Sequence, residues 1–242
     1  MAMGSAHDTD RAVDAADAAL LHPLSHVRFW LIAGLILWLD LWSKSWVFTH
    51  LRQDDVRPIV PGVLDCRRSL NDGAVFGLFS GYTAVFILAS MLALGLMFYL
   101  FAHSHRRQRV LHVALGLILA GAIGNLYDRA FIKADVVRSK DASASPVVHI
   151  GRIVSDPEAP IIRIGDYPDG DHAQTYRRDE VTVRQQGVVR DFLKFVPSFP
   201  AWVPKLAGRE MWPWVFNVAD ASLVCGVIML LLYTCFDRRP HG

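Results

Sequence analysis

The chain has 242 residues, of which 52% are hydrophobic and 20% are charged, and its mean hydropathy is +0.27. This balance is more apolar than that of a typical soluble domain and indicates an integral membrane protein. The formal net charge of +2, with the basic residues in loops, argues against a nucleic-acid partner. The spacing of Cys66, Cys225 and Cys235 is not typical of a disulfide framework or a zinc site.

The N-terminal segment, residues 1–28, is rich in Ala and Asp and has no long apolar run. We expect a cytoplasmic tail that is disordered or marginally helical, and not a signal peptide. The first predicted span, residues 29–48, contains Asp40 and Lys44 one helical turn apart, where they can pair. Either the pair shapes the charge of an active site, or it is a self-neutralised pair with Lys44 reaching the headgroups.

Residues 49–80 are expected to form an extracytoplasmic loop, with short strand pieces at residues 59–60 and 63–64. The loop contains the block Asn71-x-Gly73-Ala74-x-Phe76, in which glycine and small residues let the backbone approach another segment closely. A turn between a loop and a helix would have a similar sequence.

The second predicted span, residues 81–101, is apolar throughout and carries no charge. The basic connection that follows, residues 103–109, is typical of a cytoplasmic loop under the positive-inside rule. The third predicted span, residues 110–126, leads into Asn125, Asp128 and Arg129, which share one helical face. This mixture indicates a buried polar site rather than an interfacial helix cap.

Residues 131–186 form a polar insert, which we expect to be a small β-rich extracytoplasmic subdomain. Its predicted strands lie at residues 147–150, 152–154, 161–164 and 180–184. Residues 187–236 are expected to form a catalytic loop, with prolines and aromatics along the membrane interface, and a fourth span. Residues 237–242 form a second cytoplasmic tail.

The last span contains Asn217 and Asp220 at positions i and i+3. A carboxylate in lipid costs roughly 2.5 kcal/mol or more, so Asp220 is a candidate catalytic residue. Four crossings place both termini and the basic connection in the cytoplasm, and they bring the polar residues of the loops and span ends to one depth near the outer face. The sequence thus predicts an all-α membrane protein of four transmembrane helices, with a small β-rich extracytoplasmic portion, an inserted polar segment, and Asp191 and Asp220 as a working pair.

Five blocks in this order resemble lipoprotein signal peptidase (signal peptidase II), a family of bacterial membrane aspartyl proteases. The blocks are Asp40 with Lys44, Asn71-x-Gly73-Ala74-x-Phe76, Gly124-Asn125-x-x-Asp128-Arg129, Val188-Val189-Arg190-Asp191-Phe192, and Phe216-Asn217-x-Ala219-Asp220. The resemblance implies a catalytic dyad of Asp191 and Asp220. It also implies a substrate-binding set of Asn71, Gly73, Asn125, Arg129 and Asn217, to which the charge pattern adds Asp40, Lys44 and Asp128 as supporting residues.

The resemblance further implies that the protein cleaves diacylglyceryl-modified prolipoproteins immediately before the lipidated cysteine. We expect a multi-pass monomer in the lipid of the bacterial inner membrane, with its active site near the outer face, and neither a cofactor nor a metal ion.

Three alternatives remain open from the sequence. The insert lengthens the distance to Asp191, and Asp135 lies nearer the spacing that the family usually has. Intramembrane Asp, Lys, Asn and Arg also mark a small non-enzymatic transporter or proton-relay subunit. A structural assembly partner could use Asn and Asp as polar contacts between helices.

Overall fold

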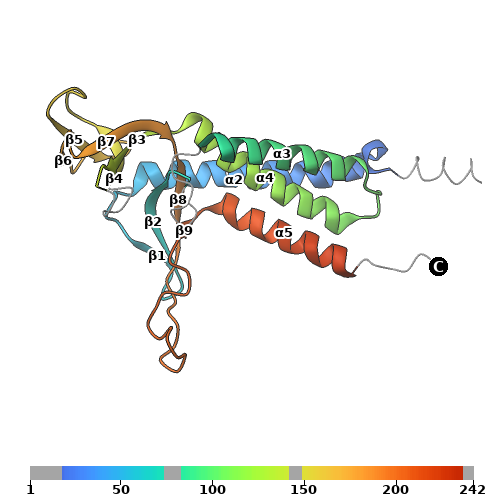
Figure 1. Cartoon of the computed structure of the whole chain (residues 1–242). Coiled ribbons are helices and arrows are strands. Elements are labelled where there is room, and N and C mark those ends of the chain that lie inside the picture. Colours follow the sequence, from blue (N-terminus) through green and yellow to red (C-terminus); the bar gives the residue numbers. More distant parts are fainter. Residues whose placement is uncertain (1–17, 74–82, 142–148, 237–242) are drawn as a thin grey trace, which may run out of the picture. The chain divides into compact units, whose positions relative to one another are not determined.

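The structure is a computed structural model that describes residues 18–73, 83–141 and 149–236 (Figure 1). A short 3-10 helix, η1 (Ala19–Leu21), precedes α2 (Pro23–His50), α3 (Thr83–Ala102), α4 (Arg109–Phe131) and α5 (Val218–Phe236). The strands are β1 (Arg57–Val60), β2 (Leu64–Asn71), β3 (Lys133–Ser139), β4 (His149–Ile153), β5 (Ile161–Asp166), β6 (Gln174–Arg177), β7 (Val181–Gly187), β8 (Val189–Phe195) and β9 (Val215–Phe216). Predictions for residues 1–17, Ala74, Phe76, Val147, Val148 and residues 237–242 fall outside the described residues.

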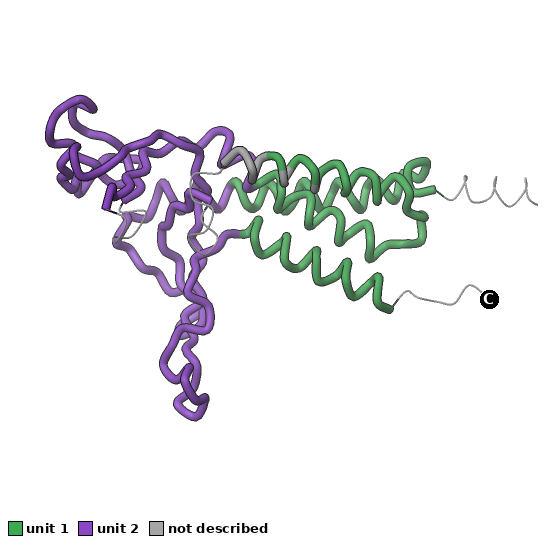
Figure 2. Tube along the Cα trace, viewed as in Figure 1, with its two compact units in different colours: residues 1–41, 88–124, 218–242 green, residues 42–87, 125–217 purple. Residues whose placement is uncertain are grey.

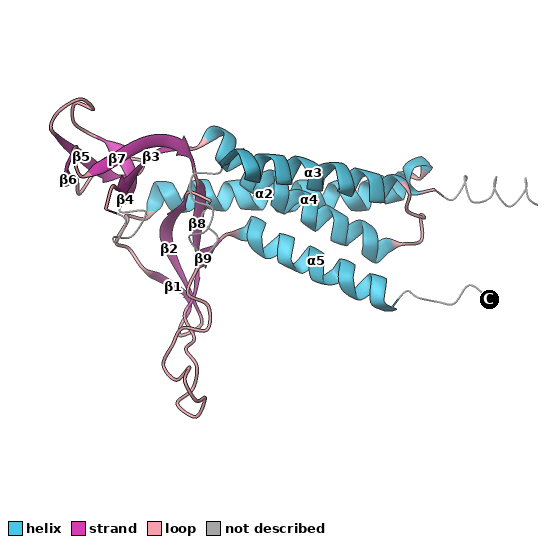
Figure 3. Cartoon of the chain, viewed as in Figure 1, coloured by secondary structure: helices cyan, strands magenta, loops and turns pink. Residues whose placement is uncertain are grey.

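The prediction of an all-α protein with four transmembrane helices is wrong. The described residues form two antiparallel sheets, with strand orders β1-β2-β8-β9 and β6-β5-β4-β3-β7 (Figure 3). Within the same residues, three helices are long and apolar enough to cross a membrane: α2, α4 and α5. The extent of the sheets was missed because β2 pairs with β8, whose residue Asp191 lies opposite Ser69. A partner so distant in sequence leaves no local pattern.

The chain divides into two compact units (Figure 2). The helical unit consists of Met1–Leu41, Leu88–Gly124 and Val218–Gly242. The sheet unit consists of Trp42–Ile87 and Asn125–Asn217. The boundaries fall inside α2, α3 and α4 and just before α5.

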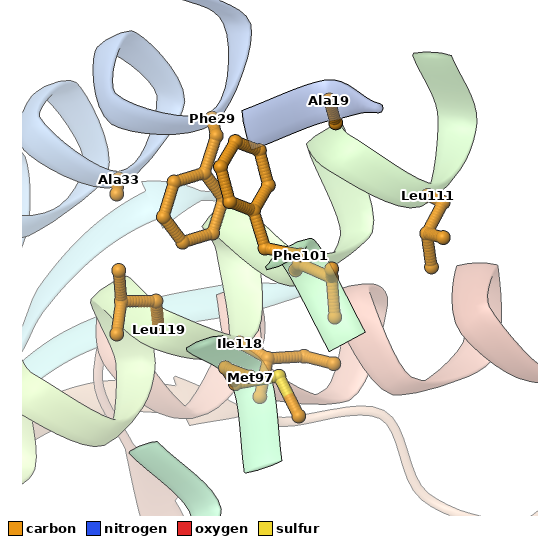
Figure 4. Packing of buried hydrophobic residues seen from close by; sticks show 9 residues of the cluster. Ala19, Phe29, Ala33, Met97, Phe101, Leu111, Ile118 and Leu119 are labelled. Carbon is orange, nitrogen blue, oxygen red and sulfur yellow. The ribbon is translucent and has the colours of Figure 1, made fainter. Parts of the chain in front are cut away.

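The helical unit is organised around a buried aromatic and aliphatic cluster contributed by η1, α2, α3 and α4 (Figure 4). The rings of Phe29 and Phe101 stack with centroids 4.5 Å apart, and Leu115 and Leu119 are fully buried beside them. In lipid, such side chains stabilise the helices by van der Waals packing rather than by transfer from water. Pro23 at the first position of α2 has the fixed φ that suits a helix start.

Two glycines bring α4 and α5 into close contact. A Cβ on Gly121 of α4 would lie 2.5 Å from the carbonyl oxygen of Ala219. A Cβ on Gly226 of α5 would lie 2.8 Å from the carbonyl oxygen of Ala114. Small residues permit such backbone approach between membrane helices. In contrast, α2 and α5 expose apolar side chains such as Leu35, Trp38, Leu231 and Leu232, as expected of helices that face lipid.

In the sheet unit, the four-stranded sheet is centred on β2 and β8. Their antiparallel register sets Asn71 opposite Val189 and Ser69 opposite Asp191. Asn71 and Asp191 are therefore diagonal neighbours, within side-chain reach of one another. This register places the first polar block of the sequence beside the fourth.

The five-stranded sheet contains the insert. β4, β5 and β7 overlap predicted strands, and β3 and β6 were not predicted. Val137, Ile162, Ile164 and Val181 form one buried cluster of this sheet. Ala134, Val136 and Val188 form a second, against which Leu70 packs. The second cluster joins the insert to β2 and to the start of β8.

Candidate active site

Asp191 lies in β8 with 2% of its surface exposed. Its Oδ2 accepts a hydrogen bond of 3.2 Å from Asn71 Nδ2, and its Oδ1 accepts one of 2.7 Å from Asn217 Nδ2. Two amides thus hold the carboxylate from both sides. A buried carboxylate with fixed donors is oriented before it meets a ligand.

The orientation of the Asn71 side chain is fixed by the turn that follows β2. Its Oδ1 accepts a hydrogen bond of 2.9 Å from the backbone N–H of Gly73. The nitrogen of the amide must then face Asp191. Gly73 has a φ of +97°, a conformation that side chains with a Cβ rarely adopt, so glycine is required here.

Asn217, the residue before α5, connects Asp191 to a second amide. Its Nδ2 also donates to Asn125 Oδ1 at 3.1 Å. Asn125 Oδ1 accepts a further hydrogen bond of 3.2 Å from Lys44 Nζ. Lys44, from α2, is fully buried. Its positive charge is therefore coupled to Asp191 through two amide side chains.

A buried ion network lies next to these amides, and Asp128 is its centre. Arg190 Nη2 donates to Asp128 Oδ1 at 2.7 Å, and the backbone N–H of Arg190 donates to Oδ2 at 2.9 Å. Lys44 Nζ lies 3.4 Å from Asp128 Oδ2. Successive strand residues point to opposite faces, so Arg190 reaches Asp128 while its neighbour Asp191 reaches the amides.

Arg129 is half-buried at the end of α4. Its Nη1 donates to the carbonyl oxygen of Asn125 at 3.4 Å. The backbone at Arg129 is fixed by close packing, because a Cβ on Gly187 would lie 1.9 Å from the Arg129 carbonyl oxygen. A guanidinium offers a planar fork of donors that suits a peptide carbonyl or a carboxylate.

Two predicted site residues belong to the helical unit. Asp40 of α2 is fully buried, and its Oδ1 accepts a hydrogen bond of 2.8 Å from the backbone N–H of Ala219 in the first turn of α5. A carboxylate that accepts an unpaired N–H at a helix start stabilises that end of the helix. Asp220, also in the first turn of α5, is half-buried.

The structure thus brings most of the predicted site residues together in the sheet unit: Lys44, Asn71, Gly73, Asn125, Asp128, Arg129, Asp191 and Asn217. The other two, Asp40 and Asp220, lie in the helical unit. Asp135, the alternative to Asp191, lies in β3, where its Oδ2 accepts a hydrogen bond of 2.8 Å from the backbone N–H of Ile153. Its carboxylate supports the five-stranded sheet.

Sequence reasoning missed the role of Arg190. The residue belongs to a recognised block, but its forked ion pair joins positions 62 residues apart, which no local spacing could reveal. The alternation of β8 was the available signal, because it separates Arg190 from Asp191. Among the described residues, no three His, Cys, Asp or Glu side chains are arranged as metal ligands.

Known proteins resemble this chain over most of its length. The family model described as signal peptidase (SPase) II matches residues 32–236. A lipoprotein signal peptidase from Desulforapulum autotrophicum is 33% identical over 219 residues, covering 88% of this chain and 95% of the relative. One from Enterococcus faecalis is 25% identical over 213 residues, covering 88% and 91%.

Solved structures show the same fold. A structure titled "Bacterial membrane enzyme structure by the in meso method at 2.3 A resolution" matches with a TM-score of 0.54 and 20% identity, covering 88% of this chain and 92% of that one. A second, similarly titled structure has a TM-score of 0.53 and 21% identity. With the family model aligned from residue 32 to residue 236, the chain belongs to the signal peptidase II family.

Proposed function

We propose that this protein is a lipoprotein signal peptidase, and that it is an aspartic endopeptidase whose catalytic dyad is Asp191 and Asp220. The observation that carries the proposal is the seating of Asp191, a buried carboxylate held by the Asn71 and Asn217 amides. The relatives are named lipoprotein signal peptidases, and we extend this substrate class to the chain because it belongs to the same family.

The contacts of the two candidate aspartates favour Asp191 over Asp135. Both oxygens of Asp191 accept from side-chain amides that belong to the recognised blocks. Asp135 instead accepts from the backbone of Ile153 within the insert sheet. A carboxylate committed to a sheet is less available for proton transfer than one that amides orient.

The short sequence separation from Asn217 supports Asp220 as the second residue of the dyad. Asp220 follows Asn217 by three residues, and three residues of chain span at most about 11 Å. Asn217 itself bonds to Asp191. Asp220 also lies in the first turn of α5, where the helix dipole favours negative charge.

The proposed chemistry uses one proton shared between the two carboxyl groups, because two carboxylates at close range do not both ionise. The ionised group removes a proton from a water molecule as the water oxygen bonds to the scissile carbonyl carbon. The protonated group gives its proton to the carbonyl oxygen. When the tetrahedral intermediate collapses, the C–N bond breaks and the amine leaves with the proton taken from water. One hydroxyl group of the intermediate returns its proton to the other carboxylate as the new carboxyl group forms.

The remaining residues would position the dyad and the substrate. Asn71 and Asn217 keep the Asp191 carboxylate in one orientation. Lys44 and Asp128 fix the amides behind it. We assign Arg129, with Asn125 and Gly73, to the peptide of the substrate, because a guanidinium and an amide can hold a backbone in place.

The substrate class we propose is a diacylglyceryl-modified prolipoprotein, cleaved immediately before its lipidated cysteine. The apolar outer faces of α2 and α5 suit a protein embedded in the bacterial inner membrane and acting on a lipid-anchored chain. We place the basic loop at residues 103–109 in the cytoplasm, with the site near the outer face of the membrane. We propose that a monomer suffices.

The test is cleavage of a diacylglyceryl-modified prolipoprotein peptide by purified protein in detergent. We expect Asp191→Asn and Asp220→Asn each to abolish cleavage while leaving thermal unfolding close to wild type. Asp135→Asn is the matched control and should still cleave. Loss of activity in Asp135→Asn but not in Asp191→Asn would reject the dyad. Failure of the wild type on several lipidated peptides would reject the substrate class.

A further inference from the structure

A basic pocket of about 450 Å³ lies within the helical unit, where α2 and α4 begin. His22, Ser25 and Arg28 contribute from the start of α2. Arg106, Arg107 and Arg109 contribute from the loop before α4 and its first residue. None of the described residues that line the pocket is acidic, so we expect a strongly positive potential in it.

The helix ends add to this potential. α2 begins at Pro23 and α4 begins at Arg109, and neither helix has an acidic residue in its first turn. The first N–H groups of a helix lack intrahelical acceptors, and the helix dipole places partial positive charge there. Two such ends and four arginines around one cavity favour a bound anion.

The walls of the pocket are held together by hydrogen bonds. Arg28 Nη1 donates to the carbonyl oxygen of Arg106 at 3.2 Å. Arg106 Nη1 lies 3.0 Å from His22 Nε2. The backbone N–H of Ala19 donates to the carbonyl oxygen of Ser104 at 2.8 Å, which ties η1 to the same loop. The cavity is therefore a preformed feature of the unit.

Ser25 supplies an independent observation. The residue is fully buried, it lines the pocket, and its Oγ has no hydrogen-bond partner among the described residues. Buried hydroxyl groups are nearly always satisfied, so an orphaned one beside a basic cavity points to a ligand atom. An anionic oxygen would accept the hydrogen bond of Ser25.

Apolar surface continues from the pocket along α2. Leu24 lines the pocket, and Leu24, Val27 and Leu31 are exposed to 58%, 54% and 63% at positions i, i+3 and i+7 of one helical face. α2 and α4 both qualify as membrane-spanning by length and composition, so we place their first residues at headgroup depth. The ligand thus meets cations at one end and an apolar helix face at the other.

We propose that this pocket binds the phosphate of an anionic glycerophospholipid, with the acyl chains lying along the Leu24–Val27–Leu31 face. Basic pockets between membrane helices bind such headgroups by charge and by donated hydrogen bonds. Arg107, Arg109 and Ser25 contact the phosphate, and Arg28 and Arg106 hold the loop in place. This lipid site is separate from the candidate active site and is not needed for the cleavage chemistry.

The test measures lipid retention by full-length protein in a neutral detergent, using native mass spectrometry with phosphatidylglycerol, phosphatidylcholine and inorganic phosphate as probes. We expect phosphatidylglycerol to bind at least tenfold more tightly than phosphatidylcholine. Arg107→Gln/Arg109→Gln should weaken phosphatidylglycerol binding by roughly fivefold for each arginine. Ser25→Ala should weaken it by a smaller factor, and this variant guards against misfolding of the double variant.

The matched control is Arg163→Gln/Arg184→Gln, which removes two charges from exposed positions of the five-stranded sheet. It should bind phosphatidylglycerol like the wild type. Equal affinity for the two lipids, or unchanged affinity in the double pocket variant, would overturn the proposal. Inorganic phosphate that binds as tightly as phosphatidylglycerol would reassign the pocket to a free anion and overturn its lipid part.

The acidic N-terminal segment is the competing occupant that the experiment must separate. Asp8, Asp10, Asp14 and Asp17 can be changed together to Asn in the full chain. Unchanged phosphatidylglycerol binding in that variant supports the lipid site. Binding that is seen only in that variant would show that the segment itself fills the pocket, and would overturn the proposal.

Discussion

Asn217 and Asp191 are joined by a hydrogen bond of 2.7 Å between the amide nitrogen and Oδ1. The same nitrogen reaches Asn125 Oδ1 at 3.1 Å, and Asn217 is fully buried. One side chain at the start of α5 therefore connects the carboxylate of β8 with the polar end of α4. Removing the Asn217 side chain would take away one hydrogen bond from Asp191 Oδ1 and one from Asn125 Oδ1.

We predict that Asn217→Ala lowers kcat for lipopeptide cleavage by roughly 100-fold, because a small misplacement of a reacting group costs about that factor. It should also lower the free energy of unfolding by about 1–3 kcal/mol, because buried polar groups lose partners. Steady-state kinetics and thermal unfolding in detergent measure the two effects. Ser69→Ala, opposite Asp191 on β2, is the control. A normal kcat in Asn217→Ala would contradict an orienting role.

The Arg190–Asp128 ion pair yields a prediction about stability. Arg190→Met should destabilise the protein by about 3 kcal/mol or more, because removing one partner leaves a buried charge poorly compensated. Arg190→Lys should recover part of the loss, since it restores the charge but not the fork. Chemical or thermal unfolding would measure both. Arg209→Met, at an exposed position, should be neutral. Equal stability of all three variants would show that the pair is dispensable.

Two glycines should respond in opposite directions to an added methyl group. Gly187→Ala would set a Cβ 1.9 Å from the Arg129 carbonyl oxygen, and the backbone cannot yield cheaply. We expect a loss of about 1–3 kcal/mol and reduced cleavage. Gly34→Ala, in α2 with nothing within 4 Å of its Cβ, should be neutral or stabilising by up to about 1 kcal/mol. If Gly187→Ala has the same free energy of unfolding as the wild type, the contact is refuted.

Two histidines of the sheet unit should give opposite pH responses. Burial lowers the pKa of His149 below its ordinary value of 6.5. As the pH falls below 6.5, His149 is protonated in the unfolded chain before it is protonated in the folded protein. Protonation of His149 therefore lowers the free energy of unfolding in acid. The hydrogen bond that His172 donates to the Asp166 carboxylate raises the pKa of His172, so its contribution is present below pH 6.5 and is lost as the pH rises through the folded-state pKa.

Unfolding measured between pH 5 and pH 8 would test this pair. His149→Asn should flatten the loss of stability in acid. His172→Asn should reduce stability at pH 5.5 and have no effect at pH 8. The idea fails if both variants shift the profile in the same direction.

Hydropathy located the four long helices of the described residues, because an apolar run such as Val218–Phe236 has few other solutions. The count of four membrane spans was wrong, and Asn217, expected inside the last helix, precedes it. Start points were less exact: α2 begins at Pro23, six residues before the predicted span. The sheets were underestimated because Leu64–Asn71 contains Asp65, Arg67 and Arg68 and has no clean alternation. Its strand character comes from pairing with β8, which is a tertiary effect.

For the candidate site, the sequence indicated which residues gather but not how they bond. Asn71, Asn125, Asp191 and Asn217 were expected at one depth, and the sheet unit brings them into one hydrogen-bonded chain. The contact from Asp40 to Ala219 joins residues 179 apart, so its role at the start of α5 was not predictable. Strands β3 and β6 of the insert were not predicted, because apolar and polar residues alternate only weakly in them.

The reciprocal glycine contacts between α4 and α5 also restrict motion. The Ala219 carbonyl oxygen packs against Gly121, and the Ala114 carbonyl oxygen packs against Gly226. Each helix therefore has a glycine at which the backbone of the other helix lies close. A slide along the axis or a turn about it would drive a carbonyl oxygen into a neighbouring side chain. The direction in which the Asp220 side chain leaves α5 is therefore set by the packing of α5 on α4, and we expect the first turn of α5 to move together with the part of α4 that it contacts.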